Sequence, residues 1–292
     1  MIIFTDKKNS RAMVTMAIGE KYQKLFEEFC KPGLMMYCKT FQYDLICISE
    51  ILDQSERASK RSPAWQKLLI LSQPWSANYQ QIVWLDTDIL INNSNATDIA
   101  KLVPIEKVGG VDQVCIPTKE LYKIAFQRYY LINFGSVPEI NNISPEDYYL
   151  NNNILCQQPM SQVFQTGVFV ASPNFHKEIF EHTYYNYEEI SSSNLMIGQF
   201  EMPALSYEII TKNLVFWIQN QFNFDVHANL YSYYPFIFKK SIANPNLLTD
   251  EFTQSENLNT FSINLQNSLK TIFDNSIFMH FNGCHHLMPK LI

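Results

Sequence analysis

Short apolar runs alternate with helically spaced apolar positions over the first 90 residues. The apolar runs predict strands at 12–18, 44–49 and 81–85. Residues 21–30 show helical spacing, and we expect Pro32-Gly33 to end that helix. A second helix is expected to begin at Ser62-Pro63, a pair suited to the N-cap and first helical position. This order predicts an α/β fold with a mostly parallel central sheet flanked by helices.

The pattern is less regular in the second half. Residues 112–160 are rich in Tyr and Asn with few clear periods, and we interpret them as a loop-and-helix insertion that lines a site. The polar, Asn-rich stretch 244–267 is expected to be a surface excursion. No repeat or long linker divides the chain, so a single domain over 1–292 is expected. Further strands are expected at 165–172, 214–218 and just before Asn282-Gly283, and helices at 175–187 and 202–212.

Composition excludes several classes of protein. A chain of 292 residues with 47% hydrophobic and 17% charged residues is too apolar to be disordered. A net charge of −6 gives no basic footprint for nucleic acid. The six cysteines form no CxxC pair, which favours reduced thiols and a cytoplasmic protein, at most peripheral to a membrane. We see no signal peptide, and no apolar run approaches the ~20 residues that span a bilayer.

Two aspartates, Asp86 and Asp88, directly follow the strand at 81–85. Ligands bind outside the carboxyl ends of strands in open α/β sheets, and a spacing of two lets both carboxylates point into one cavity. Two carboxylates in an apolar neighbourhood repel each other unless a cation lies between them. The pattern therefore favours a hard divalent ion with positions left for phosphate oxygens. The simpler interpretation is an aspartate pair that caps the strand end or the next helix.

A second chemistry uses the same pattern. Phosphatases of the haloacid dehalogenase type follow a strand with DxDxT, in which the first Asp is the nucleophile and the second the acid/base. Here Leu90 stands two residues after Asp88, the pair lies well inside the chain, and no later paired acidic motif is present for magnesium. The sequence therefore disfavours this alternative.

Seven short blocks follow one another along the chain: Ala17–Gly19, Tyr37–Asp44, Arg61–Lys67, Trp84–Ile91, Gln165–Ala171, Gln199–Leu205 and His280–Cys284. Their order resembles nucleotide-sugar glycosyltransferases of the GT-A fold, in particular the galactosyl/mannosyltransferase group with a DxD motif and a C-terminal HFxG block. The strand at 165–171 resembles the family's TGVF strand, although it reads Gln165-Thr166 where Asn-Thr is more usual. The resemblance covers about residues 12–284.

The resemblance implies a donor half over about 12–111 that binds the nucleotide sugar and a divalent cation, Mn²⁺ or Mg²⁺. Neutral imidazole is a good ligand for such ions, although a buried core histidine is the ordinary alternative for His280. A solvated lysine over a buried tryptophan is the alternative for Lys67, with Arg61 as a second candidate near the diphosphate. The implied metal ligands are Asp86, Asp88 and His280. His285 and His286 are nearby substitutes, expected rather as pyrophosphate contacts or as exposed residues. The implied donor-binding residues are Asp86, Lys67, Trp65 and Gly283.

The acceptor half is then expected over about 112–292. Glu201 and Gln199 are the implied catalytic residues, although an acid at a helix start also complements the helix dipole. The implied function is a metal-dependent transfer of a hexose from a UDP- or GDP-sugar to a hydroxyl of a glycan or other acceptor. The alternative is a catalytically silent GT-A-like module that binds sugars or acts as a scaffold. The implied contacts to sugar and acceptor are Thr166, Gly167, Tyr148 and Tyr149.

Overall fold

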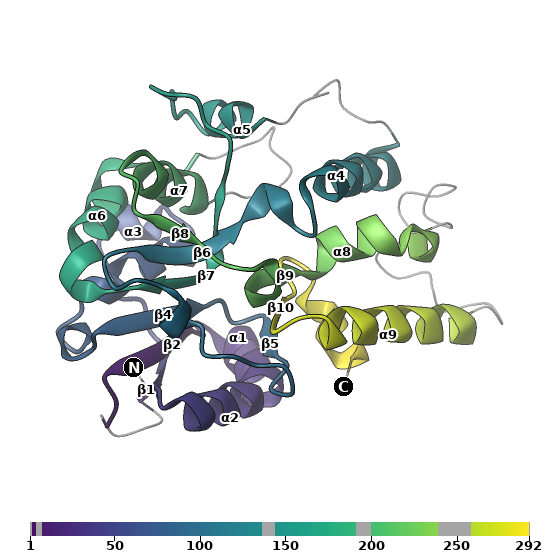
Figure 1. The fold of residues 1–292 in the computed structure, drawn as a ribbon, viewed down its shortest axis with the longest axis horizontal. Coiled ribbons are helices and arrows are strands. Elements are labelled where there is room, and N and C mark those ends of the chain that lie inside the picture. Colours follow the sequence, from purple (N-terminus) through teal and green to yellow (C-terminus); the bar gives the residue numbers. More distant parts are fainter. Residues whose placement is uncertain (1, 4–7, 136–143, 191–199, 239–257, 292) are drawn as a thin grey trace.

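The computed structural model describes residues 2–3, 8–135, 144–190, 200–238 and 258–291 (Figure 1). Within these ranges, seven strands form the main sheet in the order β1-β3-β2-β4-β7-β6-β8. The sheet therefore takes strands from both halves of the chain. Its strands are β1 (Ile2–Ile3), β2 (Arg11–Met16), β3 (Asp44–Ile48), β4 (Gln81–Leu85), β6 (Val108–Asp112), β7 (Phe164–Ala171) and β8 (Val215–Trp217).

Strand β7 runs against both of its neighbours. β2 is parallel to β3 and β4, and β6 is parallel to β8, but β7 pairs antiparallel with β4 and with β6. The short β1 is antiparallel to β3. Among the described strands of this sheet, β2, β3, β4, β6 and β8 thus share one direction, which confirms the expected mostly parallel sheet. The reversal of β7 brings the start of that strand next to the end of β4.

A second, small sheet brings the C-terminal part of the chain to the same edge. It consists, in the part of the chain described, of β5 (Ile89–Ile91), β10 (Phe278–His280) and β9 (Phe224–Asp225). β10 is antiparallel to β5 and parallel to β9, with His280 opposite Ile89 and Asp225. The amide of Phe281 donates to the carbonyl of Asp88 at 2.9 Å. The pairing therefore fixes the end of β10 against the Asp-Thr-Asp turn.

Helices cover both faces of the main sheet. Successive side chains of a strand point to opposite faces, and in these strands the side chains on both faces are apolar. Val83 and Leu85 of β4 pack in one core with α1 and α2, whereas Ile82 and Trp84 pack in a second core with α6 and α7. Figure 1 shows α2 and α6 on opposite sides of the strands, and α4, α8 and α9 beside the small sheet. The helices are α1 (Glu20–Leu25), α2 (Lys31–Phe41), α3 (Glu56–Ser59), α4 (Lys119–Phe134), α5 (Pro145–Asn151), α6 (Pro173–Asn186), α7 (Met202–Thr211), α8 (Val226–Tyr233) and α9 (Leu258–Asp274).

One expectation about a helix was wrong. Pro32 does not end the first helix: a π-helical turn over Phe26–Cys30 joins α1 to α2, and Pro32 lies in the first turn of α2, where its missing N–H is tolerated. The predicted excursion over 244–267 includes the first ten residues of α9, while 244–257 lies outside the described residues. α9 is held by Leu265 and Ile272, which are buried. Among the described helices, none is both long and apolar enough to cross a bilayer.

Candidate metal and sugar-transfer site

The Asp-Thr-Asp turn after β4 is fixed by its backbone and by the middle residue. The amide of Asp86 donates to the carbonyl of Gly167 on β7 at 2.8 Å, and the hydroxyl of Thr87 donates to the carbonyl of Met16 on β2. Thr87 thus ties the turn to the sheet. The side chains of Asp86 and Asp88 are 29% and 18% exposed. The turn therefore presents two partly exposed acids at the edge of the main sheet.

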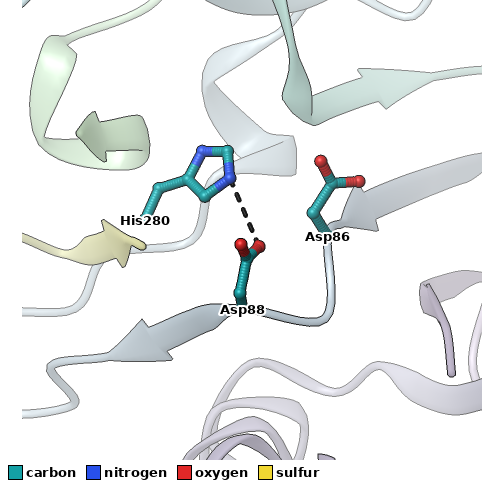
Figure 2. A group of neighbouring side chains, drawn as sticks. All are labelled: Asp86, Asp88 and His280. Atoms are coloured by element: carbon teal, nitrogen blue, oxygen red, sulfur yellow. Dashed lines mark ion pairs between the residues drawn. The ribbon is translucent and has the colours of Figure 1, made fainter. Parts of the chain in front are cut away.

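His280 joins these two acids from β10, as Figure 2 shows. One ligand atom from each of Asp86, Asp88 and His280 lies within 4.8 Å of the others. The Nε2 atom of His280 is 3.3 Å from Oδ1 of Asp88, and the ring is almost fully buried. Burial alone would lower the pKa of His280 and raise that of Asp88, but the mutual attraction outweighs it and shifts both pKa values the other way. His280 and Asp88 thus each favour the charged form of the other, and Asp86 lies beside them as a second carboxylate.

The donor set fits a divalent cation. Two carboxylates and one imidazole are ligands that Mn²⁺ accepts, and three protein ligands leave positions for the oxygens of a ligand. The three donor atoms lie within 4.8 Å of one another, close enough for the three residues to share one ion. His280 was expected either as a ligand or as a core histidine. The structure brings its Nε2 to the aspartates, and neither His285 nor His286 belongs to this group.

A buried lysine links Asp86 to the catalytic candidate of α7. Lys67 Nζ lies 2.8 Å from Oδ1 of Asp86 and 3.0 Å from Oε1 of Glu201. The same Oε1 accepts from the hydroxyl of Thr166 at 2.7 Å. The indole N–H of Trp84 also donates to Asp86, at 2.8 Å. Asp86 therefore belongs both to the metal-binding candidate and to this polar network.

The Lys67 network is shielded from water, with side chains of Lys67 and Glu201 that are 5% and 2% exposed. Burial opposes the charge on Lys67, but Asp86 and Glu201 outweigh it and raise the pKa of the lysine. Burial raises the pKa of Glu201, Lys67 lowers it, and Asp86 adds to the increase. The alternative of a solvated lysine was thus wrong: two acids need one buried cation, and Lys67 supplies it.

Other residues predicted from the sequence lie at different places. Trp65 is buried in the core, with the guanidinium of Arg61 stacked 4.4 Å from its ring, so it is not part of the cluster. Gly283 has a φ of +71° in the turn after β10, a conformation that glycine adopts freely. Gln199 lies outside the described residues. Donor contacts by Gly283 and catalysis by Gln199 stay predictions.

The two tyrosines of α5 differ in their surroundings. Tyr149 is fully buried, and its hydroxyl bonds to Ser206 at 2.6 Å and to the carbonyl of Gln162 at 3.1 Å. The hydroxyl of Tyr148 has no hydrogen-bond partner among the described residues. Burial raises the pKa of Tyr148, with further contributions from nearby acidic groups that include Glu201. Tyr149 is therefore engaged in the core, and Tyr148 has a buried hydroxyl that bonds to none of the described residues.

Sequence reasoning did not find Asn223, which directly contacts the histidine. Asn223 lies just before β9, is fully buried, and its Oδ1 is 2.8 Å from Nδ1 of His280. Gln165 on β7 accepts from the amide of Asn223. The only sequence signal was indirect, the unusual Gln at position 165. An isolated Asn in an Asn-rich chain carries no pattern of its own.

The fold and the site define an α/β protein with a mixed sheet and a candidate divalent-cation site at the end of β4. No protein-family model matches the chain, and no curated protein matches it in sequence. Among solved structures it is similar to a glycosyltransferase involved in the glycosylation of the major capsid of PBCV-1, at 11% identity and a TM-score of 0.46, covering 96% of this chain and 100% of that one.

Two other solved structures are similar over most of this chain. One is the galactosyltransferase LgtC in complex with donor and acceptor sugar analogues, at 10% identity and a TM-score of 0.44, covering 92% of this chain and 86% of that one. The other is the bifunctional glycosyltransferase WbbM, at 12% identity and a TM-score of 0.49. That match covers 95% of this chain but only 47% of WbbM. All three of these solved structures are of glycosyltransferases.

Proposed function

We propose that the protein is a metal-dependent glycosyltransferase that moves a hexose from a UDP- or GDP-sugar to a hydroxyl of a glycan or other acceptor. The observation that carries this proposal is the convergence of Asp86, Asp88 and His280 at the carboxyl edge of the main sheet. An acidic protein that needs to bind a diphosphate requires a cation to offset its charge, and this cluster is suited to hold one.

Asp88 and His280 would hold Mn²⁺ or Mg²⁺ directly, with Asp86 as a third ligand or a partner of the ribose. The bound ion would supply Lewis-acid stabilisation of the leaving diphosphate. Lys67 holds Asp86 in place through a 2.8 Å ion pair, so Asp86 does not need the ion to stay ordered. Its side chain would thus be oriented before the donor binds, which lowers the cost of binding.

Glu201 would stabilise positive charge at the reacting sugar. Its Oε1 is occupied by Lys67 and Thr166, which fixes the direction of the carboxylate. Asp86 bonds to the carbonyl of Gly167, the residue after Thr166 on β7, so sugar bound near the cation would lie against this strand. The hydroxyl of Tyr148 would contact the acceptor.

The test is release of UDP or GDP from a panel of nucleotide sugars with Mn²⁺, with Mg²⁺ and with EDTA. We expect turnover with at least one donor and a divalent ion, and loss of it with EDTA and in Asp88→Asn, which keeps the volume of the side chain. Asp274→Asn is the matched control, because Asp274 is an exposed acid on α9 paired with Lys270. An Asp88→Asn protein with wild-type turnover would exclude the metal role. Binding of nucleotide sugar without metal and without turnover would favour the catalytically silent module.

A further inference from the structure

His280 presents its two ring nitrogens to different partners. Nε2 lies 3.3 Å from the carboxylate of Asp88, and Nδ1 lies 2.8 Å from Oδ1 of Asn223. A neutral imidazole carries its proton on one nitrogen, and only the other nitrogen can bind a cation. Whether His280 can serve the proposed metal site therefore depends on which nitrogen is protonated.

The backbone of β7 determines the orientation of Gln165. The amide N–H of Gly167 points at the side chain of Gln165, and a backbone N–H can only donate. The side-chain atom that receives it must be the oxygen, Oε1. The two ends of a glutamine amide are assigned from such contacts, and here the assignment follows from a donor that cannot change its role.

The orientation of Gln165 in turn determines the orientation of the Asn223 amide, and Asn223 determines which nitrogen of His280 carries the proton. The Oε1 atom of Gln165 also faces the side-chain amide of Asn223, so the Asn223 atom at that contact must be the donor Nδ2. The other end of that amide, Oδ1, then faces Nδ1 of His280. An oxygen acceptor at 2.8 Å requires a proton on Nδ1, because two lone pairs at this distance would repel. Nε2 is left without a proton when the ring is neutral.

One further contact lies near Nδ1 but does not compete. The Nε2 atom of Gln165 is 3.5 Å from Nδ1 of His280, a distance at the limit of a hydrogen bond. The contact to Asn223 is 0.7 Å shorter, from 3.5 − 2.8. Both amides are buried, Gln165 at 4% and Asn223 at 0% exposure, so water does not replace these bonds.

We propose that Gln165 and Asn223 are positioning residues that hold His280 in the Nδ1–H tautomer, with Nε2 directed toward Asp88 and a divalent cation. The role toward the cation rests on the proposed metal site, but the tautomer itself does not. The chain of bonds begins at a main-chain N–H of β7 and ends at a ligand atom on β10. It explains a Gln at position 165, because an Asn there is one methylene shorter and would not reach Asn223 in the same way.

The first experiment is a titration of the full chain with Mn²⁺ alone, followed by electron paramagnetic resonance of the free ion. Asn223→Leu removes the acceptor at nearly constant volume, and we expect it to weaken Mn²⁺ binding by about 10–100-fold, as for other residues that orient metal ligands. Asn223→Asp keeps an acceptor for Nδ1–H and should retain most of the affinity. Asn229→Leu is the matched control, since Asn229 is buried on α8 and bonds to the carbonyl of Asp225 instead. Wild-type affinity in a folded Asn223→Leu protein would overturn the proposal.

The second experiment needs no variant of the positioning residues. Long-range ¹H–¹⁵N spectra of the metal-free wild type at pH 9 report which nitrogen of each neutral histidine is protonated, and His280→Gln assigns the signals. We expect His280 to carry its proton on Nδ1, and an Nε2–H tautomer would overturn the inference. If the wild type binds no Mn²⁺ but shows the Nδ1–H tautomer, the proposed metal function fails while the positioning by Asn223 stands.

Discussion

A Cβ atom at position 167 would lie 2.4 Å from Cε1 of His280, so the glycine on β7 leaves the space that the imidazole on β10 fills. The same Cβ would lie 2.8 Å from Nδ1 of the ring and 2.9 Å from Oε1 of Gln165. Gly167 was expected to allow close approach of a sugar. The structure gives it a different neighbour, and the sugar contact stays a prediction.

Gly167→Ala should therefore displace the His280 ring. We expect a loss of about 1–3 kcal/mol in the free energy of unfolding, as for other overpacked sites, together with weaker Mn²⁺ binding. Urea unfolding and a Mn²⁺ titration measure the two effects. Gly33→Ala on α2 is the control, because a Cβ there meets no atom closer than 3.5 Å. Equal stability and equal Mn²⁺ affinity in Gly167→Ala would show that the ring is not confined by this glycine.

Lys67→Met should be strongly destabilising. The ammonium is the shared partner of Asp86 and Glu201, and removing one member of a buried ion pair typically costs about 3–5 kcal/mol. The double variant Lys67→Met/Glu201→Gln should be less destabilised, because one of the orphaned charges is then gone. Urea unfolding compares both with Lys212→Met, which breaks a half-exposed pair with Glu208 and should cost about 1 kcal/mol or less. A double variant no more stable than the single one would argue against the coupling of Lys67 and Glu201.

Tyr148→Phe should weaken acceptor binding without changing the stability of the fold. Since the hydroxyl of Tyr148 has no partner among the described residues, its loss should leave the free energy of unfolding nearly unchanged. We expect it to raise the KM of a saccharide acceptor more than the KM of the nucleotide sugar. Tyr149→Phe is the opposite case, because its hydroxyl bonds to Ser206, and about 1–2 kcal/mol of stability should be lost. Equal changes of both KM values in Tyr148→Phe would remove this residue from the acceptor site.

His176 should make the protein less stable in mild acid. It is fully buried on α6, where its Nδ1 accepts from the amide of Ser172 at 2.9 Å, and burial lowers its pKa below the ordinary value of 6.5. The unfolded chain then binds more protons than the native state once the pH falls below about 6.5, so stability falls with it. His176→Asn keeps an acceptor for Ser172 but cannot titrate. Its free energy of unfolding between pH 7.5 and 5 should decrease less than that of the wild type, and parallel curves would contradict the assignment.

Local patterns predicted the elements that depend on neighbouring residues. The strand at 81–85 and the acids after it were predicted with the observed bounds, because a run of apolar residues needs only burial on both faces. Ser62 caps the 3₁₀ helix Pro63–Ser72 as expected, since capping is a contact between adjacent residues. The direction of β7 was not predictable, because a strand reads the same in either orientation.

The sequence by itself determined which residues of this protein carry charge and metal-ligating atoms, and where the chain forms strands. Only the tertiary structure decided which of them meet. The pairing of β10 with β5 places His280 beside Asp88, although 192 positions separate them. Lys67 and Glu201 pair in the core because two helical segments pack on one face of the sheet. Such contacts depend on long-range packing, and a residue such as Asn223 gains its role only from the groups that packing brings to its two ends.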